Sequence, residues 1–263
     1  MSAHVRMADG VVMVRPFATS IEHLLAELER VDLMIRARVA QVRQAQTDDE
    51  HFRGLYISEQ EVDELLRKPL GVPQWLSAGN PGRWDAIAEA LARVDADVAM
   101  RSDLARRHGV ELRLERLQRV FALERFDVDV LLVCLASELD LRYEKLYAYL
   151  QDDVTRKRPT VDLMLNLLTP SPAAQLQARR RFADDAPLRR HRLIEAFDDP
   201  ASPHPTLLSR GLKADERIVA YLFGDDGAID ARLRPFAELL VPGGGLGSLI
   251  EHPALPQGLG EIT

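Results

Sequence analysis

The residues of this sequence that could do chemistry are arginines and lysines gathered in three short basic segments. Guanidinium and ammonium groups bind phosphate and carboxylate oxygens, so these segments could contact a nucleic-acid backbone if the fold brought them onto one face. They could equally pair with the many acidic residues nearby in the sequence. The candidate interaction residues are Arg156, Lys157, Arg158, Arg179, Arg180, Arg181, Arg189, Arg190 and Arg192.

Patterns typical of catalytic and cofactor sites are missing from the sequence. Gly243–Gly247 is rich in glycine but lacks the lysine of a nucleotide phosphate-binding loop. No HExxH motif, zinc-spaced cysteine pair or GxSxG motif occurs, and no two histidines stand at i and i+4. Several acidic pairs occur at the ends of predicted elements, where we expect solvated caps and turns rather than catalytic dyads. The sequence therefore predicts no catalytic, metal-binding or cofactor-binding residue.

The 263 residues include 34 basic and 41 acidic side chains, which give a formal net charge of -7. This balance argues against a general nucleic-acid-binding protein, because no overall positive field would attract phosphates. The single cysteine, Cys134, lies in an apolar run, so we expect a core thiol in a reducing compartment. The N-terminus lacks the layout of a signal peptide, and no run approaches the roughly 20 apolar residues of a membrane helix. We expect a soluble, cytoplasmic protein without membrane contact.

The longest stretch of helical periodicity, Leu123–Leu168, predicts three consecutive short helices. The first follows Asp127, the expected N-cap, and its apolar residues on nearly all sides predict the buried helix of a domain. The two further helices and two strand candidates that follow cover residues 143–150, 160–168, 188–197 and 206–212. Three helices followed by a hairpin with a long polar tip are typical of a winged helix, whose wing is the hairpin.

The third helix of this stretch, Thr160–Leu168, is too apolar for the usual role of its counterpart in DNA-binding winged helices. There the third helix enters the major groove and presents polar side chains to base edges. Here the only polar residues after Thr160 are Asp162 and Asn166, and neither can neutralise a phosphate. We therefore expect the helix to be covered by the core of its own domain or, as a second choice, by a partner.

Upstream, apolar residues recur every three or four positions over Ile21–Val42 and predict one long amphipathic helix, with Thr19 or Ser20 as its N-cap. This helix could pack along the rest of its own domain, which we favour, or pair with a partner helix. A short strand is expected before it at Val11–Val14. A second long helix is expected over Trp84–His108.

Between the two long helices, Ser58–Glu61 matches a capping box for a short helix, and a loop rich in proline and glycine holds Trp75. We expect Trp75 and Trp84 to seal a junction with the next unit rather than to stack on a ligand. Gly109 is placed to end the second long helix, and Asp215 is placed to cap a short helix after the hairpin.

From Val241 onward the sequence is rich in glycine and proline and has little periodicity, which predicts a linker. The expected fold is mostly α, with a helical N-terminal arm and a winged-helix-like domain that carries a small β-hairpin wing. The predicted parts are residues 1–110 for the arm, 111–240 for the winged-helix-like domain and 241–263 for a linker toward a further module.

Most of residues 113–240 resembles the region that precedes the ATPase module in a family of bacterial AAA-type ATPases. The most specific part is ELDLRYEKLYAYLQDDVTRKRPTVDL, at 138–163, and the segments PLRRHRLIEAFDD and LLSRGLKADERIVAYLFGDD also fit. Some members of this family are encoded with contractile injection systems. The resemblance implies a winged-helix-like N-terminal domain, a linker and then the ATPase module, so ATP and magnesium would belong to that module. No catalytic residue of the family falls on this sequence.

The leading hypothesis is therefore a non-catalytic interaction domain of an AAA-type ATPase, which recognises a partner or substrate protein or aids assembly. Homo-oligomers could form through the parent ATPase module. The alternative is a DNA-binding winged helix in which the basic segments 156–158, 179–181 and 189–192 hold phosphates. A stand-alone enzyme has no residue in the sequence to support it.

Overall fold

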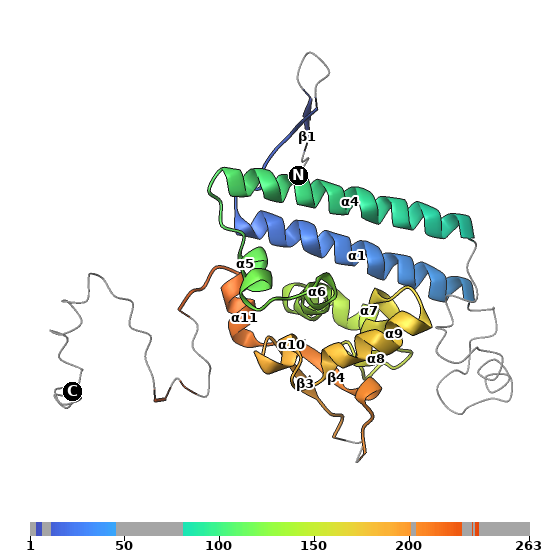
Figure 1. Ribbon diagram of the computed structural model, residues 1–263. Helices are drawn as coiled ribbons and strands as arrows, with labels where there is room; N and C mark the ends of the chain where they lie inside the picture. Colours follow the sequence, from blue (N-terminus) through green and yellow to red (C-terminus); the bar gives the residue numbers. More distant parts are fainter. Residues whose placement is uncertain are drawn as a thin grey trace, which may run out of the picture.

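The computed structural model describes residues 4–6, 12–45, 81–200, 204–227, 233, 235 and 236. Two long helices, α1 (Ser20–Ala45) and α4 (Pro81–Arg107), lie side by side, and α1 lies between α4 and the rest of the chain (Figure 1). Both long helices were predicted from their periodicity. The N-cap of α1 is Thr19, whose hydroxyl accepts a hydrogen bond from the Glu22 amide at 3.2 Å.

The centre of the fold is α6 (Arg125–Leu139), whose six residues from Val130 to Leu135 are all 0% exposed. This confirms the prediction of a buried central helix and places Cys134 in the core, where burial raises the pKa of the thiol and keeps it protonated. Asp127 is not the N-cap that the sequence predicted. Glu124 is the N-cap, and Asp127 closes the capping box from the third helical position by accepting a bond from the Glu124 amide at 3.0 Å.

Helices α7 and α8 and the predicted wing complete a winged helix around α6 (Figure 1). The wing is the antiparallel pair β3–β4, in which Ile194 is opposite Ala214 and Phe197 is opposite Gly211. The first strand is shorter than the predicted 188–197 because α10 takes up its start, with Pro187 in the first helical turn, where proline is favoured. The second strand is displaced from the predicted 206–212, because residues 207–209 form a 3-10 turn and the strand begins only at Gly211. The remaining elements of this half are α5 (Arg113–Val120), α7 (Arg142–Leu150), α8 (Val161–Leu168), α9 (Pro172–Ala178), η1 (Arg179–Phe182), α10 (Pro187–Arg190), β3 (Ile194–Phe197), η2 (Leu207–Ser209), β4 (Gly211–Ala214) and α11 (Glu216–Leu222).

One strand of the described chain was not predicted. The expected strand near Val14 is β2 (Val12–Val14), and it pairs antiparallel with β1 (His4–Arg6). The helix predicted from Ser58–Glu61, the loop around Trp75 and the linker predicted at 241–263 lie outside the described residues.

The apolar side of α1 belongs to the same core as α6 and α8. Its five core residues are Leu24, Leu28, Val31, Ile35 and Val39, each 9% exposed or less. The first of our two expectations for this helix, packing along its own domain, is therefore confirmed. The boundary predicted at residue 110 stays a prediction, although α1 shares one core with the residues beyond it.

Five helices end in the same way, with a residue of positive φ followed by an amide that bonds back to a carbonyl five positions earlier. Gly109 ends α4 and Gly224 ends α11, as their residue type suggests. The other three ends use residues with a side chain, which the left-handed region disfavours, namely Ala122, Asp152 and Arg192.

We expect Ala122→Gly to raise the free energy of unfolding by about 0.5–1 kcal/mol, because glycine removes the cost of φ +50° while adding some freedom to the unfolded chain. Urea unfolding followed by circular dichroism measures the change. Ala90→Gly, inside α4, is the matched control and should destabilise by about 1 kcal/mol. A loss of stability in Ala122→Gly would show that φ is not strained at this end.

Candidate functional site

The structure separates the first of the three basic segments from the other two. Arg158 lies at the C-terminal end of α6, where its Nη1 donates to Ser137 Oγ at 2.6 Å and to Glu138 Oε1 at 2.8 Å. Arg181 lies at the other end of α6, against Asp127. Ser137 and Asp127 are ten residues apart on one helix, which corresponds to about 15 Å.

The second and third segments come together because η1 packs against α10. Within them, Arg181 is neutralised by Asp127, to which its Nε donates at 2.9 Å, and by Glu124. Arg189 is paired with Asp184 at 2.7 Å. Pairing also takes up Arg156, whose Nε is 3.1 Å from Asp153. Among the candidate residues, five have side chains without a hydrogen-bond or ion-pair partner in the described part of the chain: Lys157, Arg179, Arg180, Arg190 and Arg192.

Helix α8 is enclosed, as its apolar sequence predicts. Val161, Leu163, Met164 and Leu165 are each at most 3% exposed, and the helix packs against α1, α6, α9 and η2. Its position in the fold is that of a DNA-reading helix, but other helices of the same chain cover it.

The two polar groups of α8 are tied within the protein. The Asn166 side-chain amide donates to Asp162 at 2.9 Å and accepts from Gln175 of α9 at 3.0 Å. Burial raises the pKa of Asp162, and the Arg38 guanidinium of α1 opposes that shift. Burial also lowers the pKa of Arg38 to about 9, so this guanidinium stays charged at neutral pH. Both polar side chains of α8 thus bond to partners of the same chain, while Asp162 itself is exposed.

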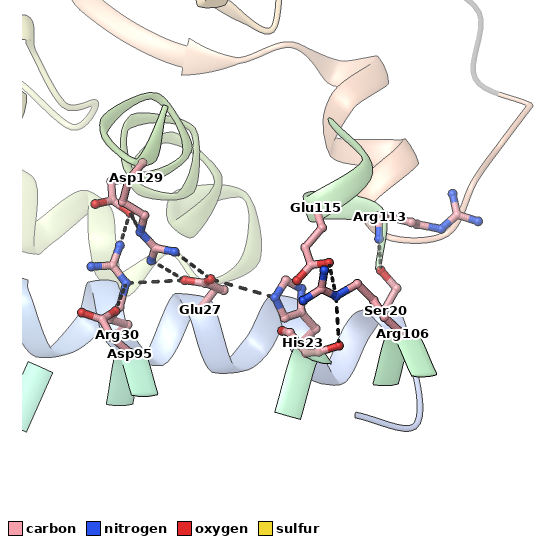
Figure 2. A network of polar contacts seen from close by, with 11 residues as sticks. Ser20, His23, Glu27, Arg30, Asp95, Arg106, Arg113, Glu115 and Asp129 are labelled. Carbon is pink, nitrogen blue, oxygen red and sulfur yellow. Dashed lines mark hydrogen bonds and ion pairs between the residues drawn. The ribbon is translucent and has the colours of Figure 1, made fainter. Parts of the chain in front are cut away.

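A cluster of charged side chains joins α1, α4 and α6, and no motif in the sequence indicated it (Figure 2). Glu27 of α1 accepts two bonds from Arg125 of α6, at 2.9 and 2.6 Å. Arg30, on the next turn of α1, contacts Glu27 at 3.4 Å, bonds to Asp129 and reaches Asp95 of α4 at 3.4 Å. We call Glu27, Arg30, Asp95, Arg125 and Asp129 the interhelix charge cluster.

Three members of this cluster are buried and two are about half-exposed. The side chains of Glu27 and Arg30 are each 6% exposed and that of Asp129 is 11% exposed, whereas Arg125 is 47% and Asp95 is 51% exposed. Burial raises the pKa of Glu27, but the hydrogen bond and charge of Arg125 outweigh it, so the net shift is downward. For Asp129 burial dominates over Arg30 and Arg125 and raises the pKa to about 6. The cluster thus fastens α4 to the winged helix through charges that depend on each other.

Beside the cluster, a cleft of about 470 Å³ opens between α1, α4, α5 and α6. His23 lies in it with the Nε2 atom 3.9 Å from Glu27 Oε1, and burial lowers the pKa of His23, so the ring is neutral at pH 7. His23 Nδ1 and Ser102 Oγ are buried without hydrogen-bond partners among the described residues. The ion pairs here hold helices together, and the described part of the chain contains no group of three or more His, Cys, Asp or Glu side chains that could hold a metal ion.

We expect stability to depend on pH through Asp129. Its pKa is about 6 in the folded protein against 3.8 for the free side chain, so the folded state binds the proton more tightly. The stability of the wild type relative to Asp129→Asn should therefore rise as the pH falls from 7 through 6 to 5. His23, whose pKa is lowered by burial, acts in the opposite direction in both proteins, so the difference between them isolates Asp129. Below about 4.5 Glu27 also lowers stability, because its pKa is lower in the folded protein and the unfolded chain takes up the proton first.

Urea unfolding at several pH values tests this prediction. The matched control is Asp103→Asn, whose side chain is 46% exposed on α4 and which should keep the wild-type profile. If the difference in stability between the wild type and Asp129→Asn did not change between pH 7 and 5, Arg30 and Arg125 would outweigh burial at Asp129.

Comparison with known proteins gives one match that covers most of the chain. A family model described as "Winged helix domain, variant" matches residues 7–237, including α1, α4 and the helices and wing that follow. No curated protein and no solved structure matches significantly. Among the described residues, no helix is both long and apolar enough to cross a membrane.

Proposed function

We propose that this chain, which belongs to the family of variant winged helix domains, is a non-catalytic protein-interaction domain. The observation that carries the proposal is the enclosure of α8. Val161, Leu163, Met164 and Leu165 are buried, and the two polar side chains, Asp162 and Asn166, already bond within the protein. The helix carries no cationic side chain that could contact bases or phosphates. A partner is then recognised by the outer surface of the domain.

Residues 113–240 resemble the region that precedes an AAA-type ATPase module. This resemblance suggests the setting in which the domain acts, namely a protein that also contains such a module. In that setting the domain recognises a partner or substrate protein, or aids assembly, while a separate module binds ATP and magnesium and hydrolyses ATP. Some relatives in that resemblance are encoded with contractile injection systems, which makes a component of such a device a reasonable first partner to test. The catalytic step would take place outside this chain.

A DNA-binding function is the second candidate, and the unpaired Arg179, Arg180, Arg190 and Arg192 favour it. A mobility-shift assay with duplex DNA over a salt series separates the two. Several phosphate contacts would give strong binding at about 50 mM salt that weakens by orders of magnitude at about 200 mM. We expect no shift at the lower salt concentration.

The positive test of the proposal uses the parent protein in its native cell. In-cell crosslinking followed by affinity purification through this domain should recover a protein crosslinked to described residues of the chain. Recovery of nucleic acid alone, with no protein crosslink, would reject the proposal.

A further inference from the structure

We propose that the corner formed by η1, α10 and the end of α5 docks a short acidic segment of a partner protein. This inference rests on the proposed function and adds the chemistry of the partner. We call Arg119, Arg180, Arg190 and Arg192 the basic corner. All four residues are exposed, and none of their side chains has a hydrogen-bond or ion-pair partner among the described residues.

The basic corner is placed by contacts on both sides. The turn η1, which carries Arg180, packs against α10, which carries Arg190. The ring of Phe121, at the end of α5, lies 5.0 Å from the ring of His191 between centroids. Residues 121 and 191, far apart in the sequence, are thereby neighbours, and Arg119, Arg190 and Arg192 each lie within two positions of that contact.

The charge of this corner is opposite to that of the rest of the chain. Residues 179–192 contain six arginines and two aspartates, a formal charge of +4, whereas the whole chain has -7. The other 249 residues therefore carry -11. Within the segment, Arg181 and Arg189 are already paired, so the positive potential comes from the arginines that remain.

Buried apolar side chains hold the backbone of the basic corner in place. Phe182, Leu188 and Leu193 are each at most 4% exposed and anchor η1, α10 and the start of the wing. Arg192 ends α10 with φ +53°, a conformation that glycine would adopt at lower cost, and its backbone amide bonds to Arg189. A rigid backbone leaves only side-chain freedom to be lost on binding, which favours docking of a ligand here.

The surroundings favour an acidic protein segment over a nucleic acid. A duplex is a long polyanion that would extend beyond the corner, and the residues outside the segment 179–192 carry a net negative charge. Only charges farther apart than about 8–10 Å are largely screened from one another. A short acidic segment can remain within the corner. Val120, which is 63% exposed next to Arg119, also offers an apolar contact that a peptide side chain can use and a phosphate backbone cannot.

Fluorescence anisotropy with a labelled peptide of Glu and Leu residues tests the inference, with a peptide in which Gln replaces every Glu as the ligand control. The wild-type chain should bind the acidic peptide, more weakly as salt increases, and bind the Gln peptide at least about tenfold less tightly. The variant Arg180→Glu/Arg190→Glu/Arg192→Glu should lose at least about tenfold in affinity for the acidic peptide.

The matched protein control is Arg43→Glu/Lys145→Glu/Lys157→Glu, which changes the net charge equally at exposed positions on α1, α7 and the loop after α7. It should keep most of the wild-type affinity, and circular dichroism should show both triple variants folded. Equal losses in the two variants, no binding by the wild type, or tighter binding of duplex DNA at the corner would each overturn the inference. A protein partner that crosslinks equally to wild type and corner variant would overturn it too, while leaving the proposed function intact.

Discussion

Replacing Asp127 with alanine should lower the free energy of unfolding by about 3–5 kcal/mol. The Asp127 side chain is 0% exposed and has two roles, as the partner of Arg181 and as the closing residue of the α6 capping box. Its removal leaves the Arg181 guanidinium, 16% exposed, beside a vacated buried site with only Glu124 as a partner. The Glu124 amide also loses its acceptor, and the start of the central helix is left without its reciprocal cap.

Urea unfolding of Asp127→Ala against Asp185→Ala measures this effect. Asp185 is exposed, so its replacement should change stability by no more than about 0.5 kcal/mol. Arg181→Ala and the double variant complete a thermodynamic cycle, in which the double variant should be more stable than the sum of the two single losses predicts. A loss below about 1 kcal/mol for Asp127→Ala would mean that water replaces the carboxylate.

Glu27→Ala should cost a comparable amount, about 3–5 kcal/mol. Glu27 is the carboxylate that contacts both Arg125 and Arg30 from α1, and its removal leaves two guanidinium groups close together with only aspartates to offset them. Arg30 cannot move its charge to solvent without leaving the α1–α4 contact, because its side chain is only 6% exposed.

The matched control is Glu29→Ala, two residues along the same helix on the exposed side, which should change stability by no more than about 0.5 kcal/mol. Hydrogen exchange adds a local readout, because Glu27→Ala should increase exchange in α4 more than in α6. Uniform protection of α4 in the variant would contradict the role of the cluster in fastening that helix.

Periodicity was a reliable guide wherever a helix has an apolar side that meets the core. It predicted α1, α4 and α8. It also predicted that α8 would be covered by protein, because only two of its eight residues are polar and a helix in contact with solvent needs a polar face. The wing followed from two strand candidates around a polar loop, although α10 shortened it. The cap of α6 was misassigned because Glu124 and Asp127, three residues apart, can each act as the N-cap and only the backbone conformation distinguishes them.

The interhelix charge cluster shows why part of the site could not be predicted. His23, Glu27 and Arg30 recur at spacings of four and three, the pattern of one helix face, but polar residues on one face usually indicate a solvated surface. Their partners Arg125 and Asp129 lie 98 and 99 residues away in the chain. This face is buried because α4 packs against it. Helical periodicity does not show which helices of a chain pack against one another.

The sequence by itself determined the elements of this protein, its acidic balance and the apolar character of the third winged-helix segment, because these depend on residues close together in the chain. Only the tertiary structure decided which arginines are neutralised. Arg181 and Arg189 look like Arg180 and Arg190 in the sequence, yet the first two meet carboxylates and the last two do not. That difference depends on distances of a few ångströms between side chains, since charge pairing in proteins falls off over such distances. The fold therefore selects the free cations of the basic corner from a larger set of equivalent residues.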